Sequence, residues 1–277
     1  MIDILLATYN GEKYLSQQID SIIAQTCKDW QLLIRDDLST DNTVNIIKSY
    51  TRRHPDKIRL IEDNKGHLGL ARNFEALLES AQSEFIMFCD QDDIWLPNKI
   101  ELTLNTMKAA RQTWPNAPLL VHTDLKVVDE TLKPIAESFW KLNRISPESD
   151  CQLKKIIYQN IVTGCTVMIN KKAKEISMPF PPEASIHDWW IALNVVKYGK
   201  ILHMAMPTVL YRQHTANLIG AKKSLKEDTL LLPQKFVHAR RFLLSDYRMA
   251  KKIAPDISLV QWLLKNIALS FGRRFKL

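Results

Sequence analysis

Four short apolar runs, separated by segments with helical spacing, limit what the first part of this chain can fold into. The runs are Ile2–Ala7, Trp30–Ile34, Ile58–Ile61 and Phe85–Cys89. Apolar runs of this length are typical of strands that are buried on both faces. Strands that alternate with helices form a mostly parallel sheet with right-handed crossovers. We therefore predict an α/β fold with a Rossmann-like, mostly parallel sheet that is flanked by helices.

The segments between the runs predict the helices. Apolar residues recur at helical spacing over Tyr14–Gln25 and Asp41–Tyr50, and again from Leu70 onward. Ser39 or Thr40 is placed to cap the second of these helices, because a short hydroxyl side chain accepts a free N–H at a helix start. Each apolar run is thus followed by one predicted helix.

The pattern is less regular after Pro97, which opens a further helix. We expect strands at residues 119–124, at Lys126–Asp129 and at Val167–Ile169. Ser185–Tyr198 predicts a helix whose first turn contains an acid, where the helix dipole favours negative charge. The second part of the chain therefore continues the α/β fold with a less predictable order of elements.

Polar residues follow the predicted strands at their carboxyl ends. They are Thr8–Asn10 after the first, Asp36 and Asp37 after the second, residues 64–69 near the third and Asp90–Asp93 after the fourth. Ligands of open parallel sheets bind beyond these ends, so four loops are expected to meet at one crevice. The chain has neither a Gly-x-Gly-x-x-Gly fingerprint nor a phosphate-binding Gly-rich Lys loop. Dinucleotide oxidoreductases and P-loop enzymes are therefore disfavoured.

The densest group of acids is Asp90-Gln91-Asp92-Asp93, directly after the buried run 85–89. Three carboxylates so close together repel one another unless a cation or hydrogen-bond donors stabilise them. A hard divalent metal held by carboxylate oxygens is one explanation. A polar turn that is acidic without binding a metal is the other.

Composition agrees with one compact catalytic domain and an appendage. The chain has 277 residues, of which 46% are hydrophobic and 25% charged. The apolar start is too short and too acidic for a signal peptide, and no apolar stretch reaches the roughly 18 residues of a membrane span. We therefore expect a cytoplasmic protein. Its four cysteines have no zinc-ligand spacing, so we expect them to be reduced and structural.

The positive charge is confined to the tail. Residues 221–277 contain 13 Lys and Arg against 4 Asp and Glu, whereas residues 1–220 are nearly neutral. A predicted helix over Ser258–Phe271 places Val260, Leu264, Ile267 and Phe271 on one face. This face either contacts a membrane surface or packs on the catalytic domain or on a second copy of the chain, as a homodimer. Nucleic acid is not expected, because the tail lacks aromatic residues interleaved with its cations.

Four motifs occur in order along the chain: Thr8-Tyr9-Asn10-Gly11, Asp36 to Thr43, Asp90-Gln91-Asp92 and His187-Asp188-Trp189-Trp190. Taken together, they resemble family 2 glycosyltransferases of the GT-A fold. The resemblance covers about residues 1–220 and implies a nucleotide-sugar half at 1–120, an acceptor half at 121–220 and a basic helical extension at 221–277. The stretch Asp90–Lys99 is most similar to bacterial rhamnosyltransferases that build surface polysaccharides.

The resemblance implies a nucleotide-sugar donor, either a dTDP-sugar such as dTDP-rhamnose or a UDP-sugar. A donor of this kind needs a surface for the base, a partner for the ribose and neutralisation of the diphosphate. A solvated turn at residues 36–37 and a surface cation at position 72 are the alternatives. The implied donor-binding residues are Thr8, Tyr9, Asn10, Asp36, Asp37, Arg72, Asn73, Asp90 and Gln91.

The same resemblance implies a metal and a general base. Asp92 matches the ligand of a Mg²⁺ or Mn²⁺ that bridges the phosphates, with His214 as a further ligand. Asp188 matches the base that takes the proton of the attacking acceptor hydroxyl, and one displacement inverts the anomeric centre. An ordinary polar His214, an Asp188 that only caps its helix and an Asp93 that only caps the next helix are the alternatives.

The acceptor is expected to be a growing glycan or a lipid-linked glycan. Phosphohydrolases also place Asp-x-Asp after an apolar strand, but here the motif follows the fourth strand and no later Lys element is evident. A non-enzymatic basic protein that binds membrane or nucleic acid is the remaining alternative. The residues implied at the acceptor are Asp124, Gly164, Cys165 and Trp189, the last of which has a core position as its alternative.

Overall fold

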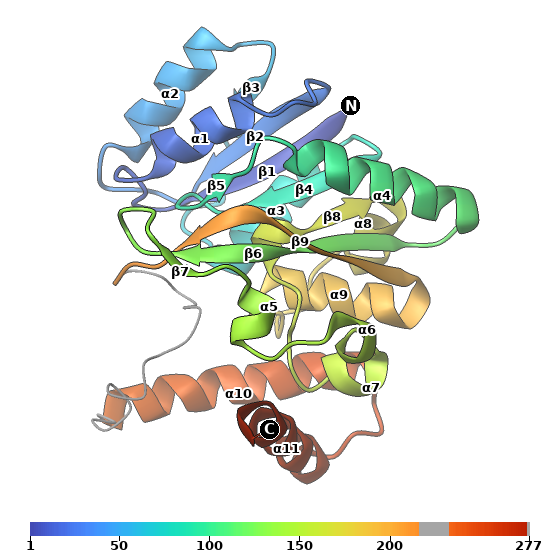
Figure 1. Ribbon diagram of the computed structural model, residues 1–277. Coiled ribbons are helices and arrows are strands. Elements are labelled where there is room, and N and C mark those ends of the chain that lie inside the picture. The colour runs from blue at the N-terminus through green and yellow to red at the C-terminus, as the bar shows by residue number, and fades with distance from the viewer. Residues whose placement is uncertain (216–232, 276–277) are drawn as a thin grey trace.

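A curled mixed sheet forms the centre of the computed structural model, which describes residues 1–215 and 233–275 (Figure 1). The strand order is β3-β2-β1-β4-β8-β6-β9-β5, and β7 pairs with β6. The strands are β1 Ile2–Thr8, β2 Trp30–Asp36, β3 Ile58–Leu60, β4 Phe85–Cys89, β5 Ile94–Trp95, β6 Leu119–Val128, β7 Pro134–Ala136, β8 Met168–Asn170 and β9 Lys200–Arg212. The helices are α1 Leu15–Ile23, α2 Thr43–Arg53, α3 Leu70–Ser80, α4 Lys99–Thr113, α5 Phe139–Leu142, α6 Pro147–Asp150, α7 Leu153–Ile156, the short 3-10 turn η1 Gly164–Thr166, α8 Lys171–Ser177, α9 His187–Tyr198, α10 Pro233–Ile253 and α11 Leu259–Phe275.

The first half of the sheet is parallel, as predicted. β1 pairs in parallel with β2 and with β4, and β2 pairs in parallel with β3. Ile4 and Leu6 pack into the core on one face, which includes residues of α1, α2 and α4, whereas Leu5 and Ala7 pack with α3 and α9 on the other. Helices cover both faces of this part of the sheet. The strand sequences therefore do not alternate between apolar and polar residues.

The second half of the sheet mixes directions. β8 runs antiparallel to its neighbours β4 and β6, while β6 and β9 are parallel to each other. The two strands expected at 119–124 and 126–129 are one continuous strand, β6, and its register with β9 shifts around Asp124. Two register shifts, one on each side of Asp124, thus coincide with the interruption of the sequence pattern.

The predicted helix caps are wrong in detail. α2 begins at Thr43 after Asn42, whose side chain makes no capping bond, and Asp41 rather than Ser39 or Thr40 accepts the N–H of Thr43, at 3.0 Å. The hydroxyl of Ser39 instead donates to Asp36, and it accepts the N–H of Asn10 at 2.8 Å. The Ser39 hydroxyl therefore bonds to the ends of the neighbouring strands and not to the start of the helix. Sequence spacing does not show such contacts.

The helical extension is confirmed, and it packs on the catalytic part. α10 and α11 lie next to α9 and α7, at the opposite end of the molecule from α1 and α2 (Figure 1). Trp262 of α11 is fully buried, but Val260, Leu264 and Ile267 are 65%, 62% and 51% exposed. The predicted apolar face thus does not pack on this chain's own catalytic domain. The side chain of Phe271 lies outside the described part.

Within residues 1–215 and 233–275, no helix is both long and apolar enough to span a bilayer. The four cysteines, all in the described part, are free.

Candidate active site

The polar segments after β1, β2 and β4 lie together, as their positions at strand ends predict. The side-chain amide of Gln91 donates to the carbonyl of Tyr9, and its oxygen accepts the N–H of Tyr9, both at 2.9 Å. Asn10 accepts the N–H of Thr40 at 2.8 Å and has a left-handed φ of 48°. These bonds hold three loops against one another, so the protein's own contacts organise this part of the site.

A cavity of about 270 Å³ lies beside the end of β2 and is lined in part by Arg35, Asp36, Leu38 and Asp63. Arg35 is buried and forms ion pairs with Asp37 at 3.0 Å and with Asp63 at 2.9 Å. The Arg35 guanidinium lowers the pKa of Asp63. Sequence reasoning missed Arg35 and Asp63, although an arginine directly before two acids at a buried strand end was the available signal.

The two predicted donor acids have different surroundings. Asp36 accepts the hydroxyl of Thr8 at 2.9 Å and borders the cavity. Asp37 is buried, and it accepts the N–H groups of Leu68 at 2.7 Å and Gly69 at 2.8 Å. Asp36 is therefore the one placed to meet a ligand, while Asp37 holds the loop that precedes α3.

Arg72 and Asn73 are bonded within the protein. The guanidinium of Arg72 donates to the carbonyls of Phe180 at 3.0 Å and Pro181 at 2.9 Å. Asn73 is buried and accepts a bond from Arg35 at 3.0 Å. In this structure both side chains organise the site, and their direct contact with a donor stays a prediction.

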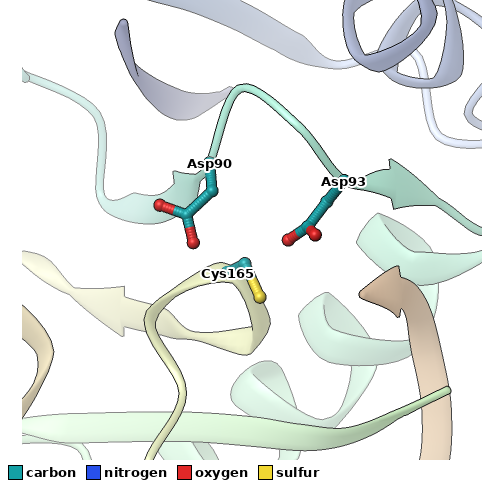
Figure 2. Close-up of side chains that lie close together, drawn as sticks. All are labelled: Asp90, Asp93 and Cys165. Carbon is teal, nitrogen blue, oxygen red and sulfur yellow. The ribbon is translucent and has the colours of Figure 1, made fainter. Parts of the chain in front are cut away.

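Asp90 and Asp93 begin and end the turn between β4 and β5, and their carboxylates face one space above Cys165 of η1 (Figure 2). One ligand atom of each lies within 4.8 Å of the others. Burial, then the charges of Asp92 and Asp188, raise the pKa of Asp90 to about 8. Asp93 accepts the N–H of Arg212 at 3.2 Å, so the expectation that it only caps the next helix is wrong.

The acids and His214 fit a hard divalent cation. Nε2 of His214 lies 2.8 Å from Oδ2 of Asp92. The Oδ2 atom of Asp93 is buried and has no hydrogen-bond partner among the described residues. Carboxylate oxygens with one imidazole suit Mg²⁺ or Mn²⁺. Burial raises the pKa of the Cys165 thiol well above its usual range, so the neutral sulfur is not a ligand for such a cation.

Asp188 lies in the first turn of α9, as predicted, and its two oxygens accept different donors. The amide of Asn160 donates to Oδ1 at 2.9 Å, and the N–H of Gly164 donates to Oδ2 at 2.8 Å. Burial raises its pKa to about 7, and these bonds oppose the rise. Asp188 also raises the pKa of Asp90, so the two carboxyls share one site. A carboxyl that ionises near neutral pH is suited to act as a general base.

Gly164 allows this close approach. A Cβ atom there would lie 2.8 Å from Nε2 of His187 and 3.2 Å from Oδ2 of Asp188. The His187 ring stacks on Phe74 with 3.8 Å between ring centroids, so it has little freedom to retreat. Sequence reasoning placed Gly164 near the acceptor but missed Asn160, which stands in an irregular stretch without a motif.

Two other residues expected at the acceptor, Asp124 and Trp189, form hydrogen bonds with other residues of the chain. Asp124 accepts the N–H groups of Leu125 at 2.8 Å and Trp140 at 3.1 Å, and also the hydroxyl of Ser138. Trp189 is buried, and its indole N–H donates to the carbonyl of Ile156 at 2.7 Å. These contacts favour a structural role, whereas Gly164 and Cys165 border the acids.

The family is shown by comparison with known proteins. The model of glycosyl transferase family 2 matches residues 3–173, which is more than half of the chain. The chain therefore belongs to this family, as its motifs predicted, and it is a glycosyltransferase.

The names of two relatives include different nucleotide sugars or sugars. The dTDP-rhamnosyl transferase RfbG of Shigella flexneri is 29% identical over 233 residues, which cover 80% of this chain and 75% of that protein. The UDP-Glc:alpha-D-GlcNAc-diphosphoundecaprenol beta-1,3-glucosyltransferase WfgD of Escherichia coli is 37% identical over 209 residues, covering 73% of this chain and 72% of that protein.

The fold matches that of solved glycosyltransferases. The mannosyltransferase PcManGT from Pyrobaculum calidifontis, in complex with GDP-Man and Mn²⁺, matches with a TM-score of 0.58 and 16% identity. The match covers 99% of this chain and 81% of that chain. At this level of identity the likeness shows the fold alone, which is the GT-A fold expected from the sequence.

Proposed function

We propose that this glycosyltransferase is metal-dependent and inverting, and that it moves L-rhamnose from dTDP-rhamnose to a hydroxyl of a growing surface polysaccharide or lipid-linked glycan. The observation that carries the proposal is the grouping of Asp90, Asp92 and Asp188, in which acids that would suit a cation lie near a carboxyl whose pKa is raised to about 7. The rhamnosyl donor is supported by the relative RfbG. The alternative is that an enzyme of this fold uses a UDP-sugar, which is supported by the relative WfgD.

The roles follow from the chemistry of a single displacement. Asp92 and His214 would hold Mg²⁺ or Mn²⁺, which when bound stabilises the negative charge of the departing diphosphate. Asp90 approaches the ribose, and the cavity beside Asp36 takes the base. Asp188 accepts the proton of the attacking hydroxyl on the acceptor side. No second carboxylate nucleophile is required when the anomeric centre is inverted in one step.

Replacing the proposed base tests its role in glycosyl transfer separately from any role in donor binding. Asp188→Asn keeps the size of the side chain and removes its basicity, so transfer should fall by at least about 100-fold while donor binding persists. Transfer is followed with dTDP-rhamnose, and binding is followed by thermal shift with and without Mn²⁺. Glu175→Gln, at an exposed position on α8, is the control and should change neither quantity. Retained transfer in Asp188→Asn excludes its role as base.

The donor is identified by the same thermal-shift assay. Because a ligand that binds only the folded state raises the melting temperature, dTDP-rhamnose is expected to produce the largest Mn²⁺-dependent shift among nucleotide sugars. A larger shift with a UDP-sugar supports the alternative donor. The absence of a shift with every nucleotide sugar contradicts the proposed donor site.

A peripheral position at the cytoplasmic face of the plasma membrane is part of the proposal. Its support is the exposed stripe formed by Val260, Leu264 and Ile267, together with the excess of cations in residues 221–277. An acceptor carried on a lipid would be met at that surface. The full name of the relative WfgD includes an acceptor of this kind, alpha-D-GlcNAc-diphosphoundecaprenol.

The membrane contact is tested with full-length protein, because removing α11 would uncover the buried Trp262. Changing Val260, Leu264 and Ile267 to Ser should abolish co-sedimentation with vesicles that contain phosphatidylglycerol. Ile135→Ser, at an exposed apolar residue of β7, is the control. If the triple variant still sediments, or if it instead converts a dimer into a monomer, the stripe does not bind lipid.

A further inference from the structure

Helix α11 bonds to three consecutive residues of the segment that leads to the proposed base, two of them through their backbone carbonyls. The indole N–H of Trp262 donates to the carbonyl of Ile157 at 2.9 Å. The side-chain amide of Asn266 donates to the carbonyl of Tyr158 at 2.5 Å, and the backbone carbonyl of Asn266 accepts the side-chain amide of Gln159 at 3.2 Å. Apolar packing alone would leave this segment free to slide, whereas directional bonds fix its position along the helix.

The residue that follows this segment contacts the base directly. Asn160 donates from its amide nitrogen to Asp188, and its amide oxygen accepts the N–H of Val162 at 3.0 Å. The second bond orients the amide, so that its nitrogen faces the carboxylate. Gly164, four positions further on, supplies the donor to the other oxygen of Asp188. One segment, residues 160–164, therefore holds both carboxylate oxygens.

Helix α10 makes a similar connection on the other side of the base. The hydroxyl of Ser245 donates to the carbonyl of Glu183 at 2.9 Å. Asp246 accepts the hydroxyl of Ser185 at 2.8 Å, directly before α9 begins. The C-terminal helices thus contact both backbone segments between which Asp188 is placed.

We infer that Trp262 and Asn266 are positioning residues for glycosyl transfer: they hold residues 157–159 so that Asn160 and Gly164 keep the Asp188 carboxylate in place. The inference rests on the proposed role of Asp188 as the base. It assigns the C-terminal extension to the catalytic machinery, in addition to any contact that its exposed face makes. Displacing a reacting group by about 1 Å commonly costs about 100-fold in rate, so a loosened segment should be visible in turnover.

The test removes single hydrogen bonds from the full-length protein. Trp262→Phe keeps an aromatic ring and loses the N–H, and Asn266→Ala loses the amide. Each should lower kcat about tenfold with the KM for the donor unchanged, because the donor half is held by other contacts. Asn160→Ala should lower kcat further and move the acidic limb of the pH profile upward, since its hydrogen bond lowers the pKa of Asp188.

Trp190→Phe is the matched control. Its indole N–H also donates to a backbone carbonyl, that of Ser177 at 2.8 Å, and its side chain is buried like that of Trp262. All variants are assayed well below their melting temperatures. The inference requires a larger loss of kcat in Trp262→Phe than in Trp190→Phe at a comparable change in melting temperature.

The outcomes distinguish this inference from the proposed function. If Asp188→Asn loses transfer while Trp262→Phe, Asn266→Ala and Asn160→Ala retain wild-type kcat, the positioning role is wrong and the base assignment stands. If Trp262→Phe and Trp190→Phe lose activity equally, the indole bond is merely structural and the inference fails. If Asp188→Asn retains transfer, the proposed base is wrong, and the positioning role fails with it.

Discussion

The donor half and the base half of the site are built in different ways. In the donor half, strand ends of one parallel sheet bond to each other, as Gln91 does with Tyr9 and Asn10 does with Ser39. In the base half, Asp188 depends on a loop, residues 160–164, and on helices from the end of the chain that hold the flanking segments. The proposed donor half is therefore held by contacts within the parallel part of the sheet, while the proposed base half also depends on helices from the end of the chain.

The largest effect on the donor half is expected at the metal position. Asp92→Asn removes a charged ligand, so transfer should fall by at least about 100-fold, and Mn²⁺ should no longer strengthen donor binding. Titration calorimetry with donor and Mn²⁺ measures this directly. Glu130→Gln, which breaks an exposed ion pair with Lys13, is the control and should bind as wild type does. If Mn²⁺ still strengthens donor binding in Asp92→Asn, Asp92 is not a ligand of the metal.

Arg35→Met tests the rigidity of the donor half. The change leaves the buried Asp37 without its cation, and breaking a buried ion pair costs about 3 to 5 kcal/mol in the free energy of unfolding. Urea denaturation measures this cost, and the exposed Arg59→Met should change it little. A loss below about 1 kcal/mol would show that this pair is not needed for the donor half to fold.

Gly164→Ala tests the base half. The new Cβ would meet the stacked His187 ring and the Asp188 carboxylate, and overpacking of this kind costs about 1 to 3 kcal/mol. Transfer should fall as well, because the N–H of Gly164 can no longer reach Asp188. Gly66→Ala is the comparison in the donor half, where nothing crowds the new Cβ and only the positive φ of 71° is unfavourable. A stability loss in Gly164→Ala no larger than in Gly66→Ala would mean that the approach is not tight.

The smallest effect is expected from Asp246 of α10. Burial raises its pKa to about 6, so the folded state binds more protons than the unfolded state between about pH 4 and 6. Its contribution to stability is therefore present at acidic pH and lost as pH rises through about 6. Asp246→Asn removes the cost of a buried carboxylate, and it should stabilise the protein at pH 8 but not at pH 4. Melting temperatures at the two pH values check this, and an equal change at both contradicts the assignment.

The sequence predicted the strands and strand ends of the parallel half of the sheet well, since buried strands have a local apolar pattern. Uniformly apolar runs such as Phe85–Cys89 identify buried strands, and acids at their ends identify the ligand side. The position of Asp188 in a first helical turn followed in the same way. Sequence spacing did not predict the ion pair of Arg35 with Asp63, because the partners come from different strand ends.

The base half was harder to predict for the same physical reason. Asn160 and Asp188 are brought together by the tertiary fold, and Asn160 stands in no motif. The periodicity of α11 correctly grouped Val260, Leu264 and Ile267 on one face. That face is exposed because Trp262, on the opposite side, supplies the contact with the catalytic part. Periodicity identifies a shared face, but it does not determine which face is buried.

The central claim, a single displacement assisted by Asp188, is tested most directly by the anomeric configuration of the product. The wild-type enzyme is supplied with dTDP-rhamnose, Mn²⁺ and an acceptor, and the new glycosidic bond is assigned by NMR from its one-bond carbon–proton coupling. We predict that the anomeric configuration is opposite to that of the donor. A product with the donor's configuration would contradict the claim, because one displacement from the face opposite the leaving diphosphate inverts the anomeric centre.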